Sequence, residues 1–125
     1  MMRFASLLFI AFLLAGCWNK NVARTYYPSG KLRTEASIKD GVLEGNAAMY
    51  YESGGKMSEA QYRAGVLHGN SVAYYENGKK RAEAGYRDGA LDGASTSWLE
   101  NGAVKDQASF VRGALVKPGE KGREQ

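Results

Sequence analysis

The sequence predicts an all-β protein, an elongated single-layer antiparallel sheet built from repeated β-hairpins. Three observations carry this prediction: the chain repeats itself every 24 residues, glycines recur in fixed columns of the repeat, and residues alternate with period two between those glycines. Period-two alternation favours strands, whereas a helix needs apolar residues three and four apart. The 125 residues are enough for one domain.

The repeat array is expected over residues 26–116. Its four copies start, without a gap between them, at Tyr26, Tyr50, Tyr74 and Trp98. Three glycine columns run through the copies: Gly30, Gly54, Gly78 and Gly102; Gly41, Gly65, Gly89 and Gly113; Gly45, Gly69 and Gly93. Glycine after Ser, Asn or Asp marks places where a chain reverses with positive φ. Each copy is therefore predicted to hold two strands, exemplified by Leu32–Ile38 and Asn46–Tyr51.

Alternation assigns the side chains of the first strand to two faces. Thr34, Ala36 and Ile38 fall on one face, and this small-small-large pattern recurs in the later copies. It predicts a strand with one buried face. All eight tyrosines occupy repeat columns and are expected mainly to pack the sheet. A possible binding surface is predicted from one tyrosine of each adjacent pair and a basic cluster: Tyr27, Tyr51, Tyr75, Lys79, Lys80 and Arg81.

The repeat has a recognisable motif. The pattern YY-x-[SN]-G-K, followed by E-A-x-Y-[RK]-x-G and x-L-x-G, resembles the bacterial variant of the MORN repeat, which occurs in proteins named the YwqK family of antitoxins. The resemblance implies an elongated, twisted single-layer sheet that associates with proteins or membrane surfaces and has no catalytic residues. The fourth copy departs from it at Trp98, Leu99, Gln107 and Lys117. Whether the fourth hairpin is complete stays open.

Candidate catalytic and metal-binding residues are few. His68 is the only histidine, and it is expected in a solvated turn. Cys17 is the only cysteine, so neither a transition-metal site nor a Ser-His-Asp or Cys-His arrangement can be assembled. These residue types predict a protein that is not an enzyme and holds no metal or cofactor.

A column of glutamates is formed by Glu35, Glu59 and Glu83. We expect these side chains on a solvated face, each paired with a cation on the adjacent strand such as Arg33 or Arg81. Exposed pairs of this kind contribute about 0–1 kcal/mol each. A cation-binding ladder and an enzyme that acts on envelope polymers are the less favoured interpretations.

The N-terminus has the layout of a signal peptide. A basic start precedes eleven residues, 4–14, that are apolar except for one serine. That segment is too short to span a bilayer core, which needs about 20 residues. The residues that follow, Leu14-Ala15-Gly16-Cys17, resemble the lipobox of bacterial lipoproteins. Residues 1–16 are therefore expected to be removed between Gly16 and Cys17, with Cys17 lipidated, residues 17–25 as its linker and 117–125 as a polar flexible tail.

The net charge and the expected lipid anchor limit the classes of partner. Loss of Arg3 with the leader leaves sixteen basic against thirteen acidic residues, a formal balance of +3. A balance so mild, with both signs interspersed, argues against nucleic acid. Trp18 stands where an aspartate would favour retention at the inner membrane, so the outer membrane is favoured. The predicted function is a membrane-anchored, non-catalytic interaction module with a protein partner in the envelope; the alternative is an antitoxin that neutralises a cognate toxin.

Overall fold

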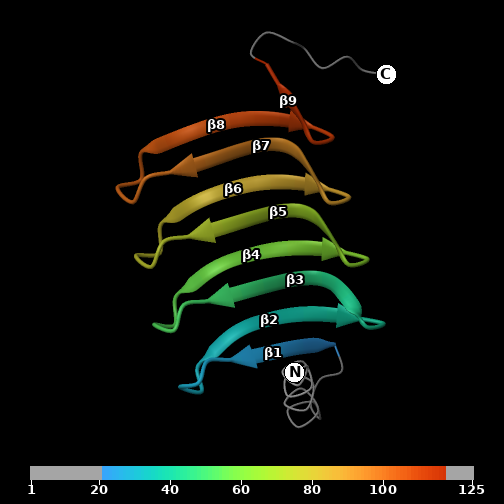
Figure 1. Ribbon diagram of the computed structural model, residues 1–125, viewed down its shortest axis with the longest axis vertical. Coiled ribbons are helices and arrows are strands. Elements are labelled where there is room, and N and C mark those ends of the chain that lie inside the picture. The colour runs from blue at the N-terminus through green and yellow to red at the C-terminus, as the bar shows by residue number, and fades with distance from the viewer. Residues whose placement is uncertain (1–20, 118–125) are drawn as a thin grey trace, which may run out of the picture.

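A computed structural model describes residues 21–117 as one open sheet (Figure 1). Its strands are β1 (Val22–Tyr26), β2 (Leu32–Lys39), β3 (Val42–Tyr50), β4 (Lys56–Arg63), β5 (Val66–Tyr74), β6 (Lys80–Arg87), β7 (Ala90–Trp98), β8 (Val104–Val111) and β9 (Ala114–Val116). Each strand pairs antiparallel with its neighbour in the chain. The predicted all-β, single-layer sheet of hairpins is confirmed. The described part of the chain contains no helix of sufficient length and apolarity to cross a membrane.

Two kinds of turn alternate along the sheet. β2 and β3 are joined by Asp40 and Gly41, whose φ angles are 51° and 80°. Two central residues with positive φ form a type I′ turn, which matches the twist of the strands on either side. The equivalent turns are Ala64-Gly65, Asp88-Gly89 and Arg112-Gly113. These turns lie at one end of the strands. The turns that contain Tyr27, Tyr51, Tyr75 and Leu99 lie at the other end (Figure 1).

The third glycine column does not form turns, contrary to the prediction. Gly45 has φ 98° and lies inside β3, which begins at Val42 rather than at Asn46. The pairing of β2 with β3 shifts register between Ala36 and Ile38, opposite this glycine. A β-bulge accommodates the extra length and the positive φ within one strand. The hairpin therefore continues through Gly45 instead of ending there.

The sheet also begins and ends differently from the expected repeat array. β1 lies in the stretch that was expected to be linker up to residue 25, and it pairs with β2 from Val22 onward. At the other end β8 has the full length of its equivalents, and β9 has only three residues. Lys117 follows β9 in the column of the bulge glycines, where positive φ is required and an L side chain is strained. The fourth copy is thus a hairpin whose second strand is cut short.

Burial is low everywhere because nothing covers either face among the described residues. Val72, in β5 at the middle of the sheet, is the one side chain classed there as buried, with 8% of its surface exposed. The prediction of one buried face is wrong: Thr34, Ala36 and Ile38 are half-buried, and so is Glu35 on the other face. A single layer gives each face only the shielding of its neighbouring side chains.

Candidate functional site

Cross-strand register decides which side chains share a face. Glu59 lies opposite Ala48 on one side and Val72 on the other, and Val72 in turn lies opposite Glu83. Partners in antiparallel strands point to the same side of a sheet. Glu35, Glu59 and Glu83 therefore stand on one face, which we call the polar face.

The opposite side carries small side chains. One row that crosses the whole sheet consists of Ala36, Ala47, Ala60, Ser71, Ala84, Ser95 and Ala108. We call this side the small-residue face. The same face also carries the rings of Tyr62, Tyr86 and Phe110. The candidate site lies on the polar face, where charged and amide side chains of neighbouring strands border one hollow.

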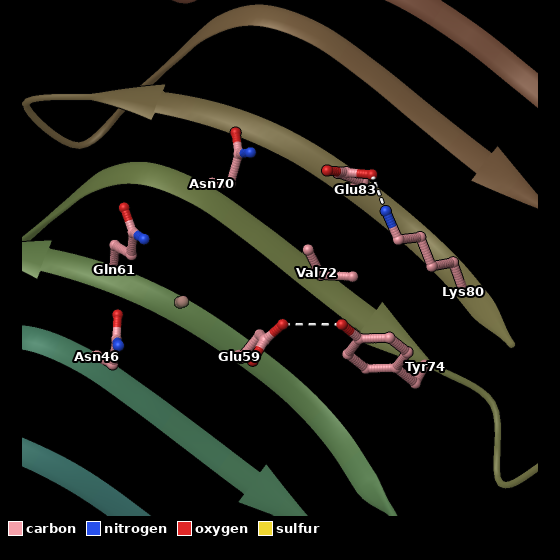
Figure 2. A pocket seen from close by; sticks show the side chains of 9 residues that line it. Asn46, Glu59, Gln61, Asn70, Val72, Tyr74, Lys80 and Glu83 are labelled. Atoms are coloured by element: carbon pink, nitrogen blue, oxygen red, sulfur yellow. Dashed lines mark hydrogen bonds and ion pairs between the residues drawn. The ribbon is translucent and has the colours of Figure 1, made fainter. Parts of the chain in front are cut away.

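A hollow of about 360 Å³ opens in the middle of the polar face, over β3 to β6 (Figure 2). Its lining residues are Asn46, Glu59, Ala60, Gln61, Asn70, Val72, Tyr74, Lys80 and Glu83. Val72 stands at its centre between the two carboxylates, and the amide side chains stand toward one end of the strands (Figure 2). The hollow therefore has a charged end and a neutral amide end.

Glu59 is the centre of the charged end. It accepts a hydrogen bond of 2.8 Å from the Tyr74 hydroxyl and one of 2.7 Å from the Lys56 ammonium (Figure 2 shows the tyrosine contact). The hydrogen bond from Lys56, and then that from Tyr74, hold the pKa of Glu59 below its ordinary value. Reciprocally, the hydrogen bond to Glu59 raises the pKa of both Lys56 and Tyr74. Glu59 is thus held as an ionised acceptor at neutral pH.

Lys80 closes the same end of the hollow. Its ammonium donates to Glu83 at 2.7 Å and lies 6.0 Å from the centroid of the Trp98 ring. The hydrogen bond to Glu83 raises the pKa of Lys80. Of the predicted basic cluster, Lys80 is the member that lines the hollow, whereas Lys79 and Arg81 are exposed outside it.

The cation partners of the glutamates differ from the prediction. Glu35 binds Arg24 on the neighbouring strand at 2.6 Å, and the predicted partner Arg33 instead lies over the ring of Tyr27. Glu59 and Glu83 each bind the lysine three residues earlier on their own strand. Residues three apart on a regular strand face opposite ways.

A bulge at the start of β6 explains how Lys80 and Glu83, three residues apart, reach the same face. The pairing of β5 with β6 shifts register between Ala73 and Tyr74, where Tyr74 lies opposite Lys80. The extra residue brings the Lys80 side chain to the face that Glu83 occupies. The same shift in β3–β4 places Lys56 beside Glu59.

The amide end of the hollow consists of Asn46, Gln61 and Asn70, from β3, β4 and β5. Asn46 and Gln61 are cross-strand partners, so their side chains stand about 5 Å apart. Within residues 21–117 none of the three side-chain amides makes a hydrogen bond to another protein group. Each amide therefore offers two N–H donors and one oxygen acceptor to a bound molecule. Sequence reasoning missed these residues because no chemical motif distinguishes them from other surface amides.

The tyrosines predicted to form a binding surface connect successive repeats. The hydroxyls of Tyr27, Tyr51 and Tyr75 donate to the main-chain oxygens of Tyr50, Tyr74 and Trp98, each at 2.7 Å. In the fourth copy the column holds Leu99, which has no hydroxyl to donate. Engagement of the phenol within the sheet gives these tyrosines a structural function, as the repeat columns suggested.

Arg87 lies away from the basic cluster of Lys79, Lys80 and Arg81. Lys80 begins β6 and Arg87 ends it, a separation of about 23 Å at 3.3 Å per residue. Arg87 instead lies 3.4 Å from Asp92 on the next strand. Basic residues close in sequence thus reach opposite ends of an extended strand.

His68 lies within β5 rather than in a turn, and its column stabilises the turns of the next repeat. Its Nδ1 atom is 3.3 Å from the main-chain nitrogen of Asp88. At the equivalent positions Glu44 accepts from the nitrogen of Ala64 at 2.6 Å, and Asp92 accepts from that of Arg112 at 3.1 Å. A column of hydrogen-bond acceptors just before each bulge glycine is the sequence signal for this contact.

The predicted lipidation and cleavage site, at Gly16 and Cys17, lies outside the described residues, as does the leader 1–16. So does most of the predicted polar tail, from residue 118 onward. These expectations stay predictions.

The geometry defines the chain as a repeat protein of the open, single-layer antiparallel type, with a polar face and a small-residue face. The family model described as the MORN repeat variant matches residues 21–40 and 67–88. The two matches cover the hairpins β1–β2 and β5–β6 and end two 24-residue periods apart. The chain contains MORN-type repeats.

Other comparisons add less. A search of curated proteins finds no match to this chain. Among solved structures, one chain of the crystal structure of accessory secretory protein 1, 2 and 3 in Streptococcus pneumoniae is similar at 14% sequence identity and a TM-score of 0.43. The similarity covers 75% of the present chain and 18% of that chain, so the present chain spans less than a fifth of its length.

Proposed function

We propose that this chain is a membrane-anchored lipoprotein of the cell envelope whose MORN-type sheet is a non-catalytic binding module for a protein partner. One observation carries the binding proposal: three neighbouring amides on the polar face, Asn46, Gln61 and Asn70, have no partner among the described residues and border a hollow. Amide groups complement the main-chain donors and acceptors and the polar side chains of another protein.

The charged end supports the same proposal. Glu59 and Glu83 are each neutralised by a lysine of their own strand, so the hollow does not select strongly for a cation or an anion. The Tyr74 ring adds a rigid aromatic surface at the charged end of the hollow. Aromatic side chains surrounded by satisfied polar groups are typical of protein interfaces.

A paired set of variants tests the binding surface. Gln61→Ala with Asn70→Ala removes two amides of the hollow, and Ser58→Ala with Ser71→Ala removes two hydroxyls of the small-residue face as the control. In envelope fractions cross-linked and isolated through the tagged chain, we expect one defined protein partner with the native chain and the control, and its loss with the amide pair. A partner retained equally by both variants would place the interface elsewhere and contradict the proposal.

The anchoring proposal rests on the lipobox-like residues before the sheet, ending at Cys17. We expect labelled fatty acid to be incorporated into the native chain and not into Cys17→Ser, and the Cys17→Ser chain to move from the membrane to the soluble fraction. Trp18 favours the outer membrane, which density separation of the two membranes measures. Neutralisation of a cognate toxin stays a prediction that rests on the family resemblance alone.

A further inference from the structure

The last strand of the sheet is incomplete. β9 consists of Ala114–Val116, whereas β7, its equivalent one repeat earlier, consists of Ala90–Trp98. β9 pairs with β8 only at Ser109, Phe110 and Val111. The first part of β8, from Val104 to Ala108, therefore has no strand on its outer side among the described residues.

The first strand of the sheet, β1, corresponds to the part of a full strand that β9 lacks. β1 pairs with β2 at Val22↔Ser37 and Ala23↔Ala36, and β3 pairs with β4 at the positions 24 residues later. In the repeat, β1 thus corresponds to the second half of β3 and lacks the half before the bulge glycine. Moved on by four repeats, Val22–Tyr26 falls on positions 118–122, directly after β9 and Lys117.

We propose that this chain associates head to tail with a second copy of itself, with β1 of one copy paired antiparallel to the open part of β8 of the next. β9 and the incoming β1 then form one complete strand in two pieces. Inside the sheet Thr34 lies opposite Met49, and Glu35 lies opposite Ala48. The same register places Thr25 of one copy opposite Asp106 of the next.

The rest of the register follows from the same repeat. Arg24 comes to lie opposite Gln107, and Ala23 opposite Ala108, by equivalence with Glu59↔Val72 and Ala60↔Ser71 in the middle of the sheet. No two side chains of like charge lie opposite each other in this pairing of β1 with β8, which we call the join. Unpaired N–H and C=O groups of an edge strand are a template for such pairing.

Side chains on β1 and on the open part of β8 are more exposed than the side chains in the same columns inside the sheet. Tyr26 has 51% of its surface exposed, whereas Tyr74 in the same column is half-buried and donates its hydroxyl to Glu59. In the join, Tyr26 stands toward Gln107 as Tyr74 stands toward Glu59, and the amide oxygen of Gln107 accepts the equivalent hydrogen bond. Gln107 is exposed in the single chain, while Glu59 is half-buried.

The join is weaker than an internal contact between repeats. Leu99 occupies the column of Tyr27, Tyr51 and Tyr75, so the hydrogen bond that those tyrosines make to the following repeat is missing here. The two surfaces in contact differ, so the association is heterologous and forms open stacks instead of closed dimers.

Disulfide trapping between two copies tests the register. Full chains in mild detergent, all with Cys17→Ser, carry either Thr25→Cys or Asp106→Cys, and a mass tag identifies one of them. After mixing and gentle oxidation we expect a disulfide between the two, with at least tenfold more product than for Thr25→Cys mixed with Gln107→Cys. Neighbouring residues on a strand face opposite sides, so the control pair differs only in face. Equal yields from both pairs would overturn the proposed register.

Measurement of size completes the test. Light scattering of the full chain should show a mass that rises with concentration, because the stacks are open. A single mass at every concentration overturns the proposal. A chain that ends at Lys117 tests the alternative that residues 118–125 of the same chain pair with the open part of β8. If only this shortened chain associates, those residues take the place of β1, and the proposal fails for the native protein.

Discussion

Tyr74 and Glu59 are joined across two strands by a hydrogen bond of 2.8 Å from the phenol to the carboxylate. Fifteen residues separate them in the chain, and the antiparallel pairing of β4 with β5 brings them together on the polar face. Lys56 approaches the same carboxylate at 2.7 Å. The three groups form a small network whose stability depends on pH at both ends of the scale.

Acid should weaken this network through Glu59. Its pKa is lowered in the folded sheet, so its contribution to stability is present above the pKa of the unfolded chain and is lost as pH falls through the folded pKa. Because the pair is largely solvated, the contribution is below about 1 kcal/mol. Urea unfolding of native and Glu59→Gln chains at a series of pH values from 7 to 3 should converge at low pH. A constant difference across the series would contradict this.

Alkali should weaken it through Tyr74. The pKa of this tyrosine is raised, so the contribution of its neutral phenol is complete below the unfolded pKa of about 10 and is lost as pH rises through the higher folded pKa. An ultraviolet titration of the native chain should contain a late component that Tyr74→Phe removes. Tyr26→Phe, in the same column on the exposed first strand, is the control for the loss of one hydroxyl.

The tyrosines that connect repeats should each contribute to stability. Tyr75→Phe removes the donor to the main-chain oxygen of Trp98 and should lower the free energy of unfolding by about 1 kcal/mol. The matched control is Tyr26→Phe in the dissociated chain, because the Tyr26 hydroxyl makes no hydrogen bond within the described residues of one copy. Chemical denaturation measures both. Equal losses would show that the hydroxyl acts through solvation instead of through the contact.

Ala64 occupies a turn position that suits another residue. Its φ is 49°, in a region where an L side chain without a local hydrogen bond is strained. Asparagine tolerates this conformation, so Ala64→Asn should raise the free energy of unfolding by about 0.5–1 kcal/mol. Asp40→Asn, where the native residue already suits the turn, should change it little. The prediction fails if both substitutions have the same effect in thermal unfolding.

Two bulge glycines should differ in their tolerance of a methyl group. Gly69 and Gly93 have φ of 111° and 107°, so alanine is strained at both, by about 1–2 kcal/mol. At Gly69 an added Cβ would also lie 2.3 Å from the Oε1 atom and 3.3 Å from the Cβ atom of Gln61, whereas at Gly93 the space is open. Gly69→Ala should therefore destabilise the sheet more than Gly93→Ala, and should displace Gln61 from the hollow. Denaturation curves of the two variants, compared directly, decide this.

Local signals explain what was predictable. The Asp40-Gly41 turn follows from two residues that both adopt positive φ, and the period of 24 residues repeats it along the chain. The bulge at Gly45 could not be separated from a turn, because the same residue type serves both geometries. The partner of Glu83 was mispredicted for a related reason: a bulge at Lys80 changes the face on which that side chain emerges.

The sequence by itself determined the hairpin repeat, the turns at its first two glycine columns and which side chains of one strand share a face, since glycine conformation and side-chain alternation act over a few neighbouring residues. Only the tertiary structure decided where the sheet begins and ends and which side chains meet on the polar face. Asn46, Gln61 and Asn70 come from three different strands, and strand register alone places them together. Register depends on each bulge between strands, and a shift of one residue moves every side chain beyond it to the other face.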